Sequence, residues 1–106
     1  MYLLEGARKE EFKLRILYDI LNVLYSNGAK SKLIALTQKQ IQSEVQKDDG
    51  ETYNERTIYS RLQELKKKGY IEEGLRIGNA KSFYISKAGI DWIVDIEKEV
   101  DEKEED

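Results

Sequence analysis

The chain has 106 residues and a mass of 12.4 kDa, which is the size of a single domain. Hydrophobic residues make up 40% of it and charged residues 37%, a composition typical of a globular domain with a heavily charged surface. It contains no cysteine and no histidine, so disulfides, thiolate nucleophiles, imidazole bases and Cys or His metal sites are excluded. Its acidic residues form no catalytic motif, and we expect no enzyme, no cofactor and no metal site.

The net charge of −3 is distributed unevenly along the chain. Residues 97–106 carry seven acids and two lysines, whereas residues 54–87 carry eight bases and four acids. We therefore divide the chain into a folded domain, residues 1–96, and an acidic C-terminal tail. No apolar run approaches the roughly 20 residues of a membrane span, and no signal-peptide pattern follows Met1. The expected location is the cytoplasm, without a membrane partner.

The first predicted element is a long helix over residues 8–27, which ends at Gly28. Its apolar arc is about twice as wide as the 100° or so of an ordinary surface helix, which predicts packing on two sides. Lys13 is a charged exception inside that arc. One apolar face contains Phe12, Ile16, Ile20 and Val23, and the second contains Leu14, Tyr18, Leu21 and Tyr25.

The second predicted helix is short. It follows a loop and an apolar stretch, residues 33–36. Thr37, with Gln40 three residues later, forms a capping box, which predicts a helix over residues 38–46. The composition of residues 47–51 then indicates a turn.

The third predicted helix spans residues 54–68. Asn54 is a favoured N-cap, and Gly69 is a favoured residue just beyond a helix end. A narrow apolar face predicts the side that packs on the core. Its members are Ile58, Leu62 and Leu65.

From residue 70 to residue 77 the apolar residues alternate as in a β-strand. Gly78-Asn79 is a two-residue hairpin turn, and residues 81–85 return as the partner strand. Ser86 then caps the last helix, whose apolar seam consists of Ile90, Ile93, Ile96 and Val100. The predicted fold class is mainly α with a small β-hairpin (α+β), in the order α-α-α-β-β-α.

This order of elements resembles that of winged helix-turn-helix DNA-binding regulators. Residues 53–71 (YNERTIYSRLQELKKKGYI) resemble the recognition helix of that family and its exit into the wing. Residues 83–89 (FYISKAG) resemble the strand-to-helix junction of MarR-like and PadR-like regulators, and Tyr59 directly after Ile58 is similar to the PadR-like pattern. The resemblance covers roughly residues 10–96 and implies a DNA-binding transcriptional regulator.

The chemistry of the third helix supports the same function independently. Opposite its apolar face lie long donors and short polar groups of the kind that read base edges in a major groove, namely Arg56, Ser60, Gln63 and Lys67. Flanking residues are within reach of phosphates, at the helix N-terminus and beside the wing turn. These flanking candidates are Asn54, Thr57, Tyr59, Arg61, Arg76 and Lys81. We expect residues 54–68 in the major groove of double-stranded DNA and the wing, residues 70–85, near the backbone or minor groove.

Structural interpretations of the same residues remain open. The run Lys66-Lys67-Lys68 also stabilises a helix C-terminus, with Lys67 the favoured DNA contact among the three. Tyr59 could instead cover the edge of the core. The rival function is a winged helix that binds protein and not DNA, which an apolar or acidic outward face of the third helix would indicate. No pattern defines an operator, an effector ligand or the direction of regulation.

The surplus apolar surface of the first and last helices predicts a homodimer, because soluble monomers seldom expose a large apolar patch. A two-fold dimer would bury this surface and place two reading helices about one DNA turn, or a multiple of it, apart. The predicted interface residues are Leu14, Tyr18, Leu21, Tyr25, Ile93, Ile96 and Val100.

Overall fold

The computed structural model of the protein describes residues 2–45, 50 and 52–105. Within them it contains, in chain order, α1 (Tyr2–Ser26), β1 (Leu36–Thr37), α2 (Gln38–Glu44), α3 (Glu55–Lys68), β2 (Ile71–Glu73), β3 (Ser82–Ile85) and α4 (Lys87–Glu105). The predicted α+β class is confirmed, with four helices and an antiparallel hairpin. The predicted order lacks one element, the short strand β1. The turn predicted at residues 47–51 lies outside the described residues, apart from Gly50.

The sheet has three antiparallel strands in the order β1-β3-β2. Leu36 of β1 pairs with Phe83 of β3, and Ile71 of β2 pairs with Ile85. A strand of two residues has no periodicity of its own, so β1 is defined only by its pairing with β3. The short apolar stretch before α2 therefore gave no strand signal in the sequence.

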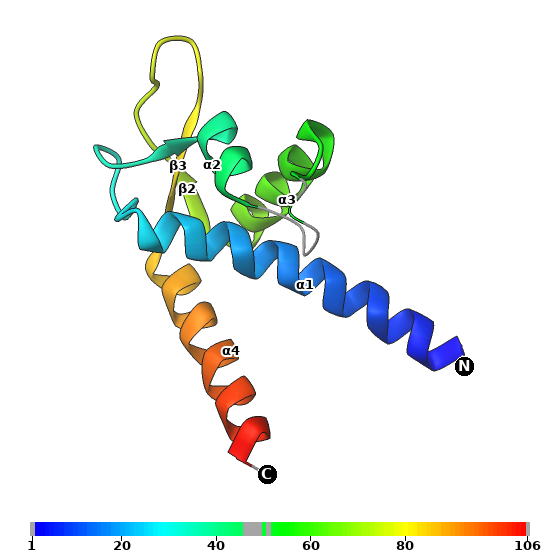
Figure 1. The fold of residues 1–106 in the computed structure, drawn as a ribbon. Helices are drawn as coiled ribbons and strands as arrows, with labels where there is room; N and C mark the ends of the chain where they lie inside the picture. The colour runs from blue at the N-terminus through cyan, green and yellow to red at the C-terminus, as the bar shows by residue number, and fades with distance from the viewer. Residues whose placement is uncertain (1, 46–49, 51, 106) are drawn as a thin grey trace.

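The predicted wing, residues 70–85, consists of β2, β3 and the segment between them, which protrudes beyond the sheet (Figure 1). At its tip Ile77 and Ala80 exchange two backbone hydrogen bonds, of 3.0 and 3.1 Å, around Gly78-Asn79, which confirms the predicted two-residue turn. The strand β2 nevertheless ends at Glu73, earlier than the alternation predicts. One reason is that the Leu75 N–H bonds to the carbonyl of Lys32, 3.1 Å away, and not to β3.

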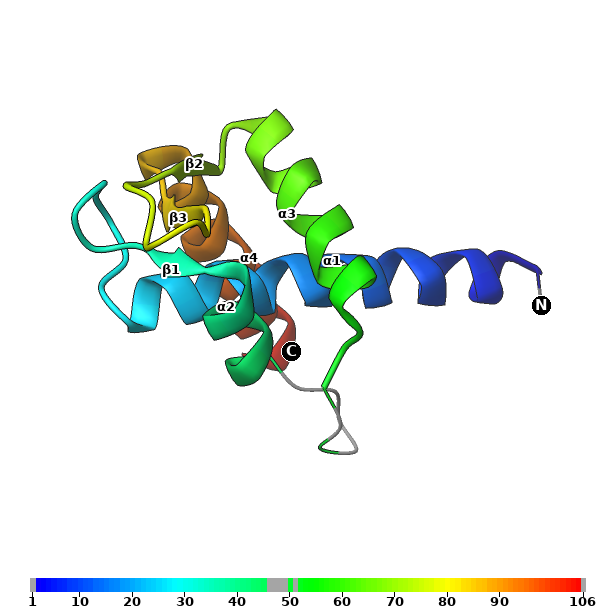
Figure 2. The same cartoon turned by 90° about the horizontal axis from the view of Figure 1, so that it is seen from above.

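Helix α1 lies across the middle of the molecule and packs on two sides, as predicted. The sheet, α2 and α3 cover one side of it, and α4 crosses the other (Figures 1 and 2). It begins at Tyr2, six residues before the predicted start. Over residues 13–26 of α1, where side chains are described, the buried residues are Ile16, Leu17, Ile20, Leu21 and Leu24. They meet a core formed mainly by Ile41, Val45, Tyr53, Ile58, Leu62, Leu65, Ile71, Phe83, Ile85 and Ile93.

This packing corrects part of the predicted dimer interface. Leu21 and Ile93 are buried inside the single chain, so neither is available to a partner. The physical reason is that α4 covers part of the second apolar face of α1, which the sequence could not place. Leu14 and Tyr25 remain exposed, and Tyr18 and Ile96 are partly buried. The side chain of Val100 lies outside the described part of the structure, as does that of Phe12.

Helices α2 and α3 begin with the predicted caps. The Thr37 hydroxyl accepts a hydrogen bond from the Gln40 N–H while the Gln40 side chain accepts from the Thr37 N–H, a complete capping box. Asn54 Oδ1 accepts a hydrogen bond of 2.8 Å from the Thr57 N–H, and α3 ends at Gly69 in the left-handed conformation, with φ of +83°. These local signals were sufficient to place α3 within the chain.

The two sequence stretches that resemble winged-helix regulators meet in space. The Ser86 hydroxyl donates to the carbonyl oxygen of Gly69, 2.6 Å away, and the Ser86 N–H bonds to the carbonyl of Tyr70. Gly89 then lies directly against the Tyr70 carbonyl, and Trp92 stacks on the Tyr70 ring with centroids 5.6 Å apart. The end of α3 and the start of α4 are thereby fastened together.

Helix α4 extends beyond this junction to Glu105, so residues 97–105 of the acidic segment continue a helix. Its far end lies on the opposite side of the molecule from the wing (Figure 1). Within the described part of the chain, no helix combines the length and apolar character needed to cross a membrane.

Candidate nucleic-acid interface

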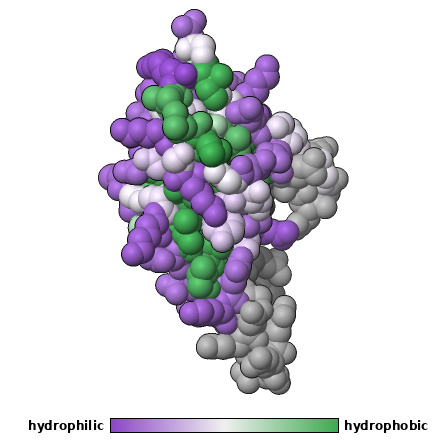
Figure 3. All heavy atoms as spheres, turned by 90° about the vertical axis from the view of Figure 1, so that its left-hand side faces the viewer, coloured by the Kyte–Doolittle hydropathy of each residue, from purple (hydrophilic) through white to green (hydrophobic). Residues whose placement is uncertain are grey.

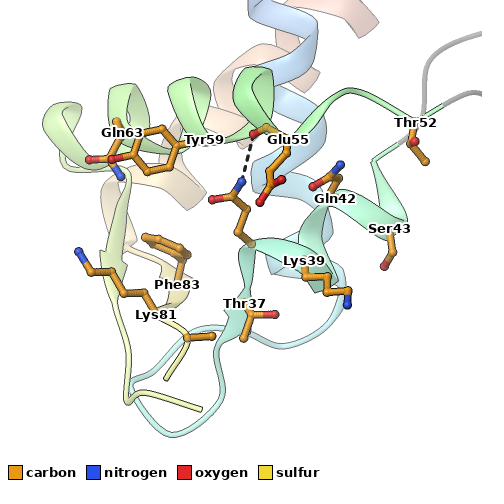
Figure 4. A pocket seen from close by; sticks show the side chains of 12 residues that line it. Thr37, Lys39, Gln42, Ser43, Thr52, Glu55, Tyr59, Gln63, Lys81 and Phe83 are labelled. Carbon is orange, nitrogen blue, oxygen red and sulfur yellow. Dashed lines mark hydrogen bonds between the residues drawn. The ribbon is translucent and has the colours of Figure 1, made fainter. Parts of the chain in front are cut away.

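A cleft of about 870 Å³ lies between α2, α3 and the base of the wing (Figure 4). Phe83 of β3 is nearly fully buried beneath it, and Tyr59 and Gln63 extend into it from α3 (Figure 4). The remaining lining is largely polar. It consists of Thr37, Gln38, Lys39, Gln42, Ser43, Thr52, Glu55, Ala80 and Lys81.

Two glutamines on α2 hold the entrance to α3 in place. Gln38 Nε2 donates to the carbonyl oxygen of Glu55 at 3.1 Å, which Figure 4 marks, and Gln42 Nε2 donates to that of Tyr53 at 3.1 Å. These side-chain bonds fasten α2 to the start of α3. Sequence reasoning did not assign either glutamine a role, because each bond joins segments that are more than ten residues apart.

The outward face of α3 has the predicted character. Arg56, Ser60 and Lys67 are exposed, while Gln63 is partly buried and turned toward the cleft. This face is displayed because the opposite one, Ile58, Leu62 and Leu65, is fully buried in the core. The structure therefore presents cationic and polar side chains to solvent along α3.

Tyr59 does not cover the edge of the core. Its side chain is 54% exposed and lines the cleft on the side facing the wing. Thr57 is partly buried, and its backbone N–H is bonded to the cap residue Asn54. The side-chain oxygen of Asn54 is thus already engaged in capping α3.

Arg61 lies away from the outward face. Its guanidinium pairs with Glu64 Oε1 at 3.1 Å, and Lys13 of α1 reaches the same oxygen at 3.2 Å. The second oxygen of Glu64 is buried, with no hydrogen-bond partner among the described residues. Lys13, the charged exception in the apolar arc of α1, thus belongs to an ion-pair network that ties α1 to α3. The phosphate contact predicted for Arg61 would have to compete with this network.

Two of the predicted DNA contacts, Arg76 and Lys81, lie on the wing and have different partners within the chain. Arg76 is exposed, and its guanidinium donates to the carbonyl oxygen of Asn79 at the wing tip, 3.1 Å away. Lys81 is paired with Glu73 of β2, with 3.4 Å between Nζ and Oε1. Lys66, at the end of α3, reaches the same Glu73 oxygen at 3.3 Å. Hydrogen bonds from Lys66 and Lys81 lower the pKa of the Glu73 carboxyl from its ordinary value.

Sequence reasoning missed this arrangement. It favoured Lys67 among the three lysines that end α3, and it gave Glu73 no role beyond its place in the strand. The relevant signal is spatial, because the three side chains come together only when β2 packs against α3 and pairs with β3.

An apolar surface covers the wing and the loop beside it. Figure 3 shows apolar side chains gathered over this side of the molecule, and the exposed members are Leu33, Ile34, Leu75 and Ile77. Leu33 is 82% exposed, which the apolar stretch before α2 did not predict. The two segments that carry these residues, 28–35 and 74–82, contain four bases and no acid.

The described residues offer no group of three or more carboxylates that could hold a metal ion. What the structure does define is a winged-helix fold: a helix-turn-helix formed by α2 and α3, followed by a protruding antiparallel hairpin and a closing helix. The cationic face of α3 and the cleft beside the wing lie on this frame.

Solved structures of RosR from H. salinarum are similar to this chain. Its RosR-S1 and RosR-S4 complex structures align with a TM-score of 0.68 and 24% identity, over 82% of this chain and 71% and 70% of theirs. A structure of RosR grown from NaBr aligns equally well, over 83% of this chain and 74% of that one. No protein-family model matches the sequence, and no curated protein is significantly similar to it. The likeness confirms the winged-helix fold, whereas assignment to PadR-like or MarR-like regulators stays a prediction.

Proposed function

We propose that the protein is a transcriptional regulator that binds double-stranded DNA in a sequence-specific manner as a homodimer. In this proposal α3 enters the major groove, and the wing lies near the backbone or the minor groove. The observation that carries it is the outward face of α3, where Arg56, Ser60 and Lys67 are exposed on a helix held rigidly by caps and core packing. The winged-helix fold that this chain shares with RosR is compatible with this function.

Base reading is assigned to Arg56, because it is exposed near the N-terminus of α3, where recognition helices contact base edges. Guanine, with two acceptors on its major-groove edge, is the base that an arginine fork fits. Arg76 is assigned to phosphate, because it is exposed at the wing tip. Asn54, Thr57, Tyr59 and Gln63 surround these two regions and complete the proposed contact surface.

Replacement of Arg56 and Arg76 by alanine tests this assignment. Loss of a bidentate base contact should cost roughly 1–3 kcal/mol on a site selected from random duplexes, with little loss on scrambled DNA. Arg76→Ala should weaken both DNAs about equally and flatten the salt dependence. Affinities would be measured by fluorescence anisotropy across a salt series.

Arg61→Ala provides the matched control, because Arg61 is on the same helix but is paired with Glu64. Arg61→Ala should lower the melting temperature of the protein, whereas its affinity for DNA should change little. If Arg56→Ala and Arg76→Ala both bind the two DNAs as the parent does, α3 and the wing do not form the DNA-binding surface.

One observation favours a second candidate function, a winged helix that binds protein. The exposed Leu33, Ile34, Leu75 and Ile77 form an apolar surface of the kind that marks protein contacts. A parent protein that binds no duplex at low salt would favour this alternative.

A further inference from the structure

Two lysines that come from different elements share a single carboxylate oxygen. Lys66 at the end of α3 and Lys81 directly before β3 lie 3.3 and 3.4 Å from Glu73 Oε1. Their side chains are 41% and 55% exposed, so both ammonium groups are open to solvent. Lys81 also lines the cleft beside Tyr59 and Gln63 (Figure 4). Through Lys81, the trio borders the candidate interface.

The charges of the trio do not cancel. Two ammonium groups against one carboxylate leave a local charge of +1, and Glu73 occupies the position between the lysines where a second anion would bind. Exposed ion pairs of this kind contribute little to stability, about 0–1 kcal/mol in measured cases. A DNA phosphate could therefore take over both lysines at little cost to the fold.

We propose that Lys66 and Lys81 form a seat for a phosphate of the DNA backbone, and that Glu73 is a built-in competitor for that seat. The inference rests on the proposed DNA-binding function and adds to it. Phosphate contacts bind all sequences alike, so a carboxylate that competes with them lowers non-specific binding in particular. Glu73 thereby leaves discrimination between sites to the base contacts of α3.

Glu73→Gln tests the proposal, with Glu72→Gln as its matched control. Both variants remove one negative charge from β2, but Glu72 bonds to the hydroxyl of Tyr84 at 2.8 Å and not to the lysines. On scrambled duplex DNA at low salt, Glu73→Gln should bind about fivefold tighter than the parent, the effect of one charge at about 4 Å in water. Its salt dependence should steepen by about 0.9, the value of one additional phosphate contact. Glu72→Gln should change neither quantity appreciably.

Lys66→Gln and Lys81→Gln test the seat with the opposite sign. Each should weaken binding to scrambled DNA. In a variant that carries both lysine substitutions, adding Glu73→Gln should restore none of the lost affinity. Thermal melts of every variant would verify folding. A Glu73→Gln protein that binds no tighter than Glu72→Gln overturns the seat, because Glu73 would then serve only to hold the wing. That result leaves the proposed function intact if the parent binds duplex DNA, whereas a parent that binds none at low salt overturns both.

Discussion

Tyr18 illustrates what a single side chain does between two helices. Its hydroxyl donates to Glu97 of α4 at 2.8 Å, across 79 residues of sequence. Burial, together with the hydrogen bond to Glu97 and its negative charge, raises the pKa of Tyr18 to about 12. Tyr18, which the sequence predicts as a dimer contact, thus ties α1 to α4 within the single chain.

This contact predicts a pH dependence of stability. Because the folded-state pKa of Tyr18 lies above the ordinary value of 10, its contribution is complete below pH 10 and is lost as the pH rises toward 12. At pH 8 Tyr18→Phe should lower the free energy of unfolding by about 1 kcal/mol, the usual net value of one hydrogen bond.

Urea titrations of both proteins at pH 8 and pH 11 measure the difference. The gap between the parent and Tyr18→Phe should narrow at the higher pH. A gap that is the same at both pH values would contradict this prediction, because ionisation of the Tyr18 hydroxyl would then not remove its contribution to stability.

At the scale of elements, the junction between α3, β2 and α4 determines how the closing helix leaves the sheet. Ser86 binds Gly69 and Tyr70 through its hydroxyl and its backbone, and Gly89 allows α4 to lie directly on the Tyr70 carbonyl. A Cβ atom at Gly89 would collide with that carbonyl and lie 2.8 Å from Ile85 Cγ1. The FYISKAG stretch thus has a steric reason for its glycine.

Gly89→Ala should therefore destabilise the protein, although alanine is the better helix former. Overpacking against a backbone carbonyl should cost about 1–3 kcal/mol, more than the gain in helix propensity. Ala88→Ser, at the exposed neighbouring position, is the control and should change stability little. Thermal denaturation followed by circular dichroism measures both. An unchanged melting temperature for Gly89→Ala would show that α4 can shift away from the sheet freely.

At the scale of the whole molecule, apolar surface remains uncovered on the α1 and α4 side. Leu14, Tyr25 and Val94 are exposed, and Tyr18 and Ile96 are only partly buried. We expect a two-fold dimer through this surface, without Leu21 and Ile93. Light scattering at tens of micromolar should give about 25 kDa, twice the chain mass of 12.4 kDa.

A surface variant tests whether this contact forms the dimer. Leu14→Glu combined with Val94→Glu should give the monomer mass with the fold retained, because both side chains are exposed in the single chain. Leu33→Glu, on the wing side, should leave the dimer unchanged. A parent that already scatters as a 12.4 kDa particle would refute the dimer.

If the protein binds DNA as proposed, we expect the acidic end of α4 to affect that binding only through its long-range electrostatic field. Residues 97–106 carry a net charge of −5, and the end of α4 lies opposite the wing in a molecule 48 Å long (Figure 1). Charges are screened beyond about 8 Å at physiological salt but only beyond about 30 Å at 0.01 M. Removal of residues 101–106 should therefore tighten non-specific DNA binding at low salt and have no effect at 0.15 M. Equal affinities at 0.01 M would contradict this prediction.

The sequence alone determined the features that depend on neighbours three or four residues apart. Thr37 with Gln40, Asn54 with Thr57, and Gly69 define where α2 and α3 begin or end, because caps are satisfied locally. The spacing of Ile58, Leu62 and Leu65 fixed the buried face of α3 and, with it, the exposure of Arg56, Ser60 and Lys67.

Tertiary structure decided whatever depends on residues far apart in the chain. Strand β1 exists only because β3 pairs with it, and Leu21 is buried because the chain returns and packs around α1. Lys13 reaches Glu64 only after α1 has packed against α3, and Glu73 contacts Lys66 and Lys81 only after β2 has packed against α3 and paired with β3. No periodicity encodes these contacts, because a charged side chain selects its partner by distance in the folded chain and not by spacing in the sequence.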